Sequence, residues 1–172
     1  AEPYMLAGKE AIVETMLYLA PMFPISTTIR YCRSVARGIV SAVRQKRVNL
    51  LILGWHGRRR SRLFHLGSTV DPVIERVPCN VAVLKNCGRD IAYRRVLVPV
   101  AGGPNSAFAL EVAAILADRD EGRVTALTVA GAGEPFDVGA FVDGVADRLA
   151  LPRDRIDTRT AAGPDVPAAI LN

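Results

Sequence analysis

The chain has 172 residues, of which 50% are hydrophobic, 23% charged and 6% aromatic. This length suits one domain of ordinary size or two small ones, and the apolar share excludes a disordered or low-complexity chain. The sequence contains no long uncharged apolar run, and it does not open with a basic leader followed by an apolar core. We therefore expect neither a membrane-spanning helix nor a signal peptide.

The net charge of +5 conceals an asymmetry between the two halves. Residues 1–89 hold 14 Lys or Arg against 5 Asp or Glu, whereas residues 90–172 hold 8 against 12. No acidic residue lies between Glu14 and Asp71. A surface with this positive field attracts phosphate, nucleic acid or lipid headgroups, and the charge alone does not choose among them.

The three cysteines and two histidines do not form a recognisable ligand set. No two cysteines make a CxxC pair, so we expect reduced thiols in a cytoplasmic chain and neither a disulfide framework nor a metal site. His56 and His65 are not accompanied by a Ser-His-Asp or Cys-His set at a recognisable sequence spacing. The sequence therefore predicts no catalytic residue.

The first half alternates helix-like and strand-like segments. Apolar residues recur at helical spacing before Pro21, and Ser34 precedes a second such stripe in the position of an N-cap. A compact apolar run without alternation, residues 49–53, is typical of a strand buried on both faces of a parallel sheet. The predicted elements are a helix over Lys9–Ala20, a strand over Ile25–Tyr31, a helix from Ser34 to Lys46, a strand over Asn49–Leu53, a helix from about Ser68 to Arg76, and a strand over Asn80–Lys85.

The second half continues the alternation after a polar connector, residues 86–93. Its predicted elements are a strand over Arg95–Val100, a turn over Gly102–Asn105, a helix over Ser106–Ala117, a strand over Val124–Ala130, a helix over Phe136–Leu149, a strand over Arg155–Thr160, and a last helix from Pro164. Strands that alternate with helices in this way indicate right-handed βαβ crossovers. The predicted fold class is α/β, a doubly wound parallel sheet with helices on both faces.

Residues 51–85 contain the pattern that points to a ligand. Gly54 ends a predicted strand, Gly57 follows three residues later, and Gly67 stands next to Ser68 at a predicted helix start. A glycine has no Cβ, so the chain can turn sharply there and approach a ligand closely. Free N–H groups at a helix start suit a phosphate, and doubly wound folds bind ligands at the carboxyl ends of their strands.

The pattern Gly-x2-Gly-x9-Gly-Ser resembles the nucleotide-binding signature of the universal stress protein family, and residues 78–84 are similar to that family's closing strand. The resemblance implies that ATP or another adenine nucleotide is bound, with Mg²⁺ as an optional companion. The residues that it implies for this role in the first half are Leu53, Gly54, Gly57, Gly67, Ser68 and Thr69.

Residues 94–117 are similar to the first strand, the turn and the first helix of the same family. The family has an Asp just past that strand, and Ala101 stands in its place, which implies weakened ATP binding at any site built from this half. Pro99 and Val129 fall where the resemblance implies apolar contacts to the base.

The resemblance implies two incomplete copies in tandem. Residues 1–89 correspond to the C-terminal half of one domain, and residues 90–172 to the truncated N-terminal half of a second. In the family's strand order, 3-2-1-4-5, as in adenine nucleotide α-hydrolase-like folds, the first strand lies beside the fourth. The strand over Arg95–Val100 is therefore expected beside Asn49–Leu53, within one chain or between two, and we expect a homodimer.

The leading hypothesis is an ATP-binding regulatory module of a stress response. We expect it in the cytoplasm, or tethered to the membrane by a region before residue 1, as in family members fused to a membrane transporter. One alternative is a slow ATPase or other phosphate-transferring enzyme, although no general base or paired carboxylates lie near the loop. Another is a family member that has lost nucleotide binding and serves in dimerisation. Nucleic-acid binding is disfavoured, because no aromatic residues interleave with the arginines.

Three features near the loop each have two interpretations. Trp55 either stacks on a base or packs over the loop. The arginines at positions 58–60 and 62 either clamp phosphates or form an exposed basic loop. Asp71 either complements the dipole of the predicted helix or binds a magnesium ion.

Overall fold

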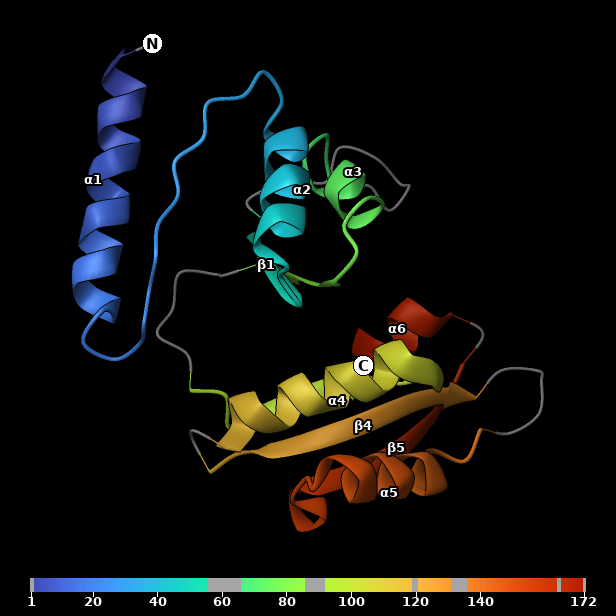
Figure 1. The fold of residues 1–172 in the computed structure, drawn as a ribbon. Helices are drawn as coiled ribbons and strands as arrows, with labels where there is room; N and C mark the ends of the chain where they lie inside the picture. Colours follow the sequence, from blue (N-terminus) through green and yellow to red (C-terminus); the bar gives the residue numbers. More distant parts are fainter. Residues whose placement is uncertain are drawn as a thin grey trace. The chain divides into compact units, whose positions relative to one another are not determined.

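The computed structural model describes residues 2–55, 66–85, 92–118, 121–130, 136–163 and 165–171. The chain divides into two compact units, unit 1 over Ala1–Gly88 and unit 2 over Arg89–Asn172. Both units alternate helices with strands, and every strand pairing is parallel (Figure 1). The predicted α/β class is therefore confirmed.

Unit 1 has three helices and one pair of strands among its described residues. The elements are α1 Glu2–Leu19, α2 Val35–Lys46, β1 Leu50–Gly54, α3 Val70–Ile74 and β2 Asn80–Leu84. Strands β1 and β2 pair in register from Leu50↔Asn80 to Gly54↔Leu84. Apart from the segment between α1 and α2, these elements follow the predicted order, with α1 starting earlier and α3 shorter than expected.

Helix α2 shows how the local sequence sets its own ends. The Ser34 side chain accepts a hydrogen bond of 3.5 Å from the N–H of Arg37, which confirms the predicted N-cap. The helix stops at Arg47, whose φ of 51° lies in the left-handed region. Ala36 and Val43 are buried on its inner side.

The predicted strand over Ile25–Tyr31 is wrong. These residues have no regular secondary structure, and the contacts with α2 begin at Arg30. The Arg30 guanidinium donates to Gln45 Oε1 and, at 3.4 Å, to Ser41 Oγ. A Cβ built on Gly38 would lie 2.6 Å from Cys32 Sγ, so Cys32 sits directly against this glycine. β-branched residues favour a strand where a neighbouring strand supplies backbone partners, and unit 1 gives this segment a helix surface instead.

The expectation that β1 is buried on both faces is also wrong for unit 1. Leu51 and Leu53 are half-buried, whereas Ile52 is 62% exposed. Successive side chains of a strand point to opposite faces, so the face that carries Ile52 is uncovered, and each strand of this pair also has one open edge within its unit.

Unit 2 is a three-stranded parallel sheet in the order β3-β4-β5, with helices in its crossovers. Its elements are β3 Arg95–Pro99, α4 Gly103–Asp118, β4 Arg123–Ala130, α5 Val138–Leu149, the short 3-10 helix η1 Arg153–Arg155, β5 Ile156–Ala162 and α6 Val166–Leu171. Apart from η1, which was not predicted, each of them matches a predicted element to within a few residues. Helix α4 begins at Gly103 rather than Ser106. Residues 103–105 of the predicted turn are therefore part of the helix.

The core of unit 2 forms where α4 and α5 pack on the sheet. Leu110 of α4 and Val142 of α5 are fully buried against Val124 and Ala126 of β4. The Asp137 side chain caps α5 by accepting the Ala140 N–H at 2.9 Å. Among the helices in the described ranges, none has the length and hydropathy needed to cross a bilayer.

Candidate functional site

The residues predicted to bind a ligand in unit 1 lie at the carboxyl end of β1 and where the chain returns after residue 65. Leu53 and Gly54 are the last two residues of β1, and Gly67, Ser68 and Thr69 lead into α3. Gly57, both histidines and the loop arginines fall outside the described residues.

Trp55 holds these two segments together. Its indole Nε1 donates a 2.7 Å hydrogen bond to the carbonyl oxygen of Leu66, while its backbone N–H donates at 2.8 Å to the Leu84 carbonyl. The Lys85 ammonium lies 5.4 Å from the ring centroid, within range of a cation–π contact. The loop over which Trp55 was predicted to pack lies outside the described residues, so both interpretations of Trp55 stay predictions.

Asp71 fixes the returning segment from the other side. Its carboxylate accepts the N–H of Leu66 at 2.9 Å and the N–H of Gly67 at 3.2 Å. The Asp71 N–H in turn donates to the Gly67 carbonyl at 3.2 Å. Neither the helix-dipole nor the magnesium interpretation includes this contact. Its sequence signal is an Asp four residues after a loop glycine, since Asp side chains often bind nearby backbone N–H groups.

The two described glycines of the motif differ in what they require. Gly67 has a φ of +126°, a conformation that side-chain-bearing residues rarely adopt, so the backbone itself demands glycine there. Gly54 is an ordinary strand residue, and a Cβ built on it would meet nothing within 4 Å. The prediction of a sharp turn at Gly54 is therefore wrong, and the backbone gives no reason of its own for glycine at that position.

Helix α3 is shorter than the predicted helix from Ser68 to Arg76. It has five residues and begins at Val70, with Thr69 at its N-cap but no side-chain capping bond. A helix of little more than one turn has a small macrodipole. Because the Gly67 N–H is donated to Asp71, any phosphate contact here depends on the N–H groups and side chains of Ser68 and Thr69.

The predicted residues of unit 2 lie at the carboxyl ends of β3 and β4. Pro99 is the last residue of β3 and pairs with Leu127, while Val129 pairs with Ala161. Pro99 is exposed and Val129 half-buried. Their positions at strand ends agree with the general location of ligand sites in doubly wound sheets.

The turn after β3 is built from small residues. The Ala101 N–H donates to Ser106 Oγ at 3.3 Å, and Gly102 and Gly103 have φ values of +86° and +80°. A Cβ on Gly102 would lie 3.1 Å from the Phe136 ring. Ala101, the residue in place of the family's Asp, is exposed.

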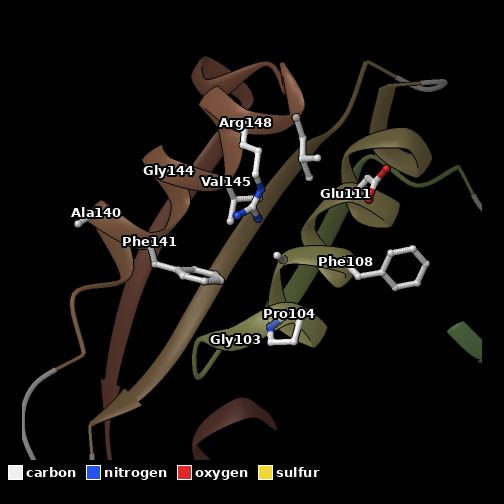
Figure 2. Close-up of a pocket in the computed structure, with 11 residues that line it drawn as sticks. Gly103, Pro104, Phe108, Glu111, Ala140, Phe141, Gly144, Val145 and Arg148 are labelled. Atoms are coloured by element: carbon white, nitrogen blue, oxygen red, sulfur yellow. The ribbon is translucent and has the colours of Figure 1, made fainter.

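A groove of about 740 Å³ separates α4 from α5, and none of the residues that line it was predicted as a site residue. Arg148 and Phe141 point from α5 into the space between the helices, whereas Phe108 points away from α5 (Figure 2). Small residues four apart on each helix create the groove. This spacing is the sequence signal from which the groove could have been predicted. They are Gly103 and Ala107 on α4, and Ala140 and Gly144 on α5.

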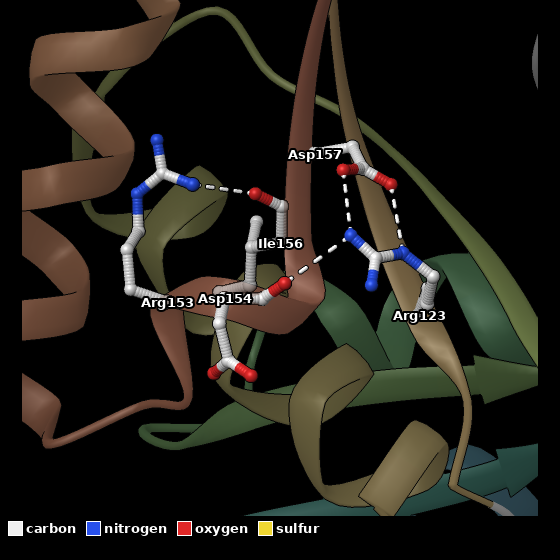
Figure 3. A network of polar contacts seen from close by, with 5 residues as sticks. All are labelled: Arg123, Arg153, Asp154, Ile156 and Asp157. Atoms are coloured by element: carbon white, nitrogen blue, oxygen red, sulfur yellow. Dashed lines mark hydrogen bonds and ion pairs between the residues drawn. The ribbon is translucent and has the colours of Figure 1, made fainter.

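An arginine–aspartate network ties the starts of β4 and β5 together (Figure 3). Arg123 forms a bidentate pair with Asp157, at 3.1 and 2.8 Å, and also donates to the Asp154 carbonyl at 3.2 Å. The hydrogen bonds from Arg123 lower the pKa of the Asp157 carboxyl and raise the pKa of the guanidinium. This network lies at the end of the strands opposite to Pro99 and Val129, so its role is structural. Within the described ranges, no three His, Cys, Asp or Glu side chains gather as a metal site.

Comparison with known protein families identifies the family that unit 1 resembles in sequence. The model of the universal stress protein family matches residues 3–85. Residues 3–85, just under half of the chain, therefore match the universal stress protein family. The match covers the Trp55–Asp71 region and ends before the residues that resemble a second copy, so the arrangement of two incomplete copies stays a prediction.

Two further likenesses extend this result. The chain is 31% identical over 100 residues to the Na(+)/H(+) antiporter NhaS5 of Synechocystis sp., a stretch that covers 55% of this chain and 14% of the antiporter. A solved universal stress protein from Archaeoglobus fulgidus matches 98% of this chain and 61% of its own, with a TM-score of 0.65 and 17% identity. At that identity the likeness shows the fold alone. The chain therefore spans only part of the length of each of these proteins.

Proposed function

We propose that this universal stress protein segment is an adenine-nucleotide-binding regulatory module of a membrane transporter. ATP, accompanied by Mg²⁺, is the proposed ligand of the region around Gly54 and Gly67–Thr69. The transporter part of the proposal rests on the antiporter relative, which belongs to a class of proteins that translocate ions. In such a protein, a bound nucleotide would report energy status to the transport domain.

The observation that carries the nucleotide proposal is the Trp55–Leu66 hydrogen bond. This bond holds the end of β1 beside the Gly67–Thr69 turn, so two parts of the motif that are separated by a loop in the sequence become neighbours. Gly67 has the positive φ that lets a turn present its backbone N–H groups closely to a ligand. Such a turn at a strand's carboxyl end suits an anionic group such as a phosphate.

Calorimetry on the 172-residue chain tests this proposal. ATP should bind saturably, and Gly67→Val should abolish binding because a β-branched residue cannot adopt a φ of +126° without strain. The matched control is Gly144→Ala in α5, where a Cβ meets nothing within 4 Å. Unchanged ATP affinity in a folded Gly67→Val variant would exclude the site.

We also propose that the chain forms a homodimer. The sheets of both units support this, because β1 and β3 each pair along one edge within their own unit, and open strand edges favour association with another chain. Light scattering should give a dimer mass, and a monodisperse monomer would overturn the proposal.

A further inference from the structure

The segment before α2 and the outer side of α2 form one continuous surface on unit 1. Arg30 reaches Ser41 and Gln45, and Cys32 packs against Gly38, so residues 29–33 lie along the helix. The exposed residues of this surface are Ile29, Arg30, Tyr31, Arg33, Val35 and Arg37, and we name it the basic face.

The basic face has three arginines and no acidic residue. It lies within the stretch between Glu14 and Asp71, which contains no Asp or Glu. Among the described residues, the side chains of Arg33 and Arg37 make no hydrogen bond or ion pair. Their guanidinium groups are therefore available to an external anion, and guanidinium geometry matches phosphate oxygens well.

Large apolar side chains stand exposed among these arginines. Ile29 is 52% exposed, Tyr31 75% and Val35 61%. Aliphatic side chains gain nothing from an aqueous anion, but they do gain from contact with a lipid surface. Tyrosine is favoured at the headgroup level, where its ring is buried and its hydroxyl remains hydrated.

We infer that the basic face docks on an anionic lipid bilayer, with arginines on the headgroup phosphates and Ile29, Tyr31 and Val35 at the acyl boundary. Charge complementarity and the exposed apolar side chains support this occupant together. A nucleic acid would use the same arginines, but it would leave Ile29 and Val35 without a partner and would offer one aromatic ring for stacking. The inference does not depend on nucleotide binding.

Co-sedimentation of the full chain with lipid vesicles tests the inference. The chain should bind equimolar phosphatidylglycerol–phosphatidylcholine vesicles at low ionic strength, bind pure phosphatidylcholine vesicles much less, and lose binding as salt is added. The double variant Arg33→Gln, Arg37→Gln should bind about thirtyfold more weakly, or roughly fivefold for each arginine. Neither substitution removes a side-chain contact seen in the structure.

The matched control is Arg95→Gln with Arg148→Gln, which removes the same charge from exposed positions of unit 2 and should leave binding unchanged. Tyr31→Ser should weaken binding, whereas Ile115→Ser, at a 65% exposed position of α4, should not. Equal loss in both double variants would mean that net charge alone is responsible and would overturn the inference. So would normal vesicle binding by Tyr31→Ser, or tighter binding to a single-stranded oligonucleotide than to the vesicles.

Discussion

The indole N–H of Trp55 donates to the carbonyl oxygen of Leu66 at 2.7 Å, across ten intervening residues of sequence. This bond closes the loop at its base and so fixes the distance between the end of β1 and the returning chain. Loop closure has an entropy cost that the contact at the base must offset. Trp55 and Leu66 therefore stabilise the arrangement on which the proposed site depends.

Trp55→Phe should lower the free energy of unfolding by about 1–3 kcal/mol, because the partly buried Leu66 carbonyl loses its donor and the smaller phenyl ring leaves part of the indole's space unfilled. Urea unfolding followed by circular dichroism measures this difference. Tyr31→Phe, which removes a hydroxyl from a 75% exposed ring, should leave the stability unchanged. An unaltered unfolding free energy in Trp55→Phe would show that the bond is not a stabilising contact.

Asp71→Asn should destabilise the chain by about 1–2 kcal/mol. An amide can offer an oxygen to only one of the two N–H groups of Leu66 and Gly67, and its NH₂ group then faces the other donor. The control is Glu75→Gln, an exposed carboxylate just after the same helix. If both variants unfold at the same urea concentration, the Asp71 hydrogen bonds do not stabilise the chain more than the exposed Glu75 carboxylate does.

Gly122→Ala should destabilise unit 2 by about 1–3 kcal/mol through overpacking. A Cβ there would lie 2.8 Å from the Cα of Arg94 and 2.9 Å from its carbonyl oxygen, and backbone cannot move aside as a side chain can. Gly144→Ala should instead stabilise α5 by up to about 1 kcal/mol, because alanine is the better helix former and its Cβ has open space. Thermal unfolding of the two variants should therefore shift in opposite directions.

The Arg123–Asp157 pair predicts a pH dependence. Its hydrogen bonds lower the pKa of Asp157 from the ordinary value of 3.8, so the carboxylate stabilises the fold at pH values above 3.8. This stabilisation is lost as the pH falls through the lowered pKa. Asp157→Asn should reduce the melting temperature at neutral pH, and the difference from the wild type should vanish in acid. A difference that is constant with pH would contradict the assignment.

Much of the element order follows from local patterns. The Ser34 cap, the parallel strands and the α4 and α5 helices each have a signal within a few residues, such as a capping side chain or an apolar stripe. Such signals do not depend on distant parts of the chain, so they predict the elements correctly.

The errors occur where partners decide the structure. Residues 25–31 have the composition of a strand, but Arg30 and Cys32 attach the chain to α2. Likewise, the apolar run of β1 indicates burial on two faces, whereas the face that carries Ile52 is uncovered within unit 1. Composition predicts what a segment can do, and long-range contacts select what it does.

The general location of the candidate site was predictable from the sequence, but the hydrogen bonds that hold its segments together were not. The glycine spacing indicates a loop that returns to the end of β1, and the positive φ of Gly67 fits that prediction. The Trp55–Leu66 and Asp71–Gly67 hydrogen bonds depend on side-chain directions that no spacing rule contains. The groove between α4 and α5 arises from small residues on two separate helices, which a motif search along the chain does not compare.

Calorimetric titration of the full chain with ATP and, separately, with adenosine tests the central claim most directly. If the Gly67–Thr69 turn binds phosphates, ATP should bind more tightly than adenosine, and added salt should narrow the difference because it screens the charged groups. Equal affinity for the two ligands, or no saturable heat with either, would contradict the claim that this segment is a nucleotide-binding module.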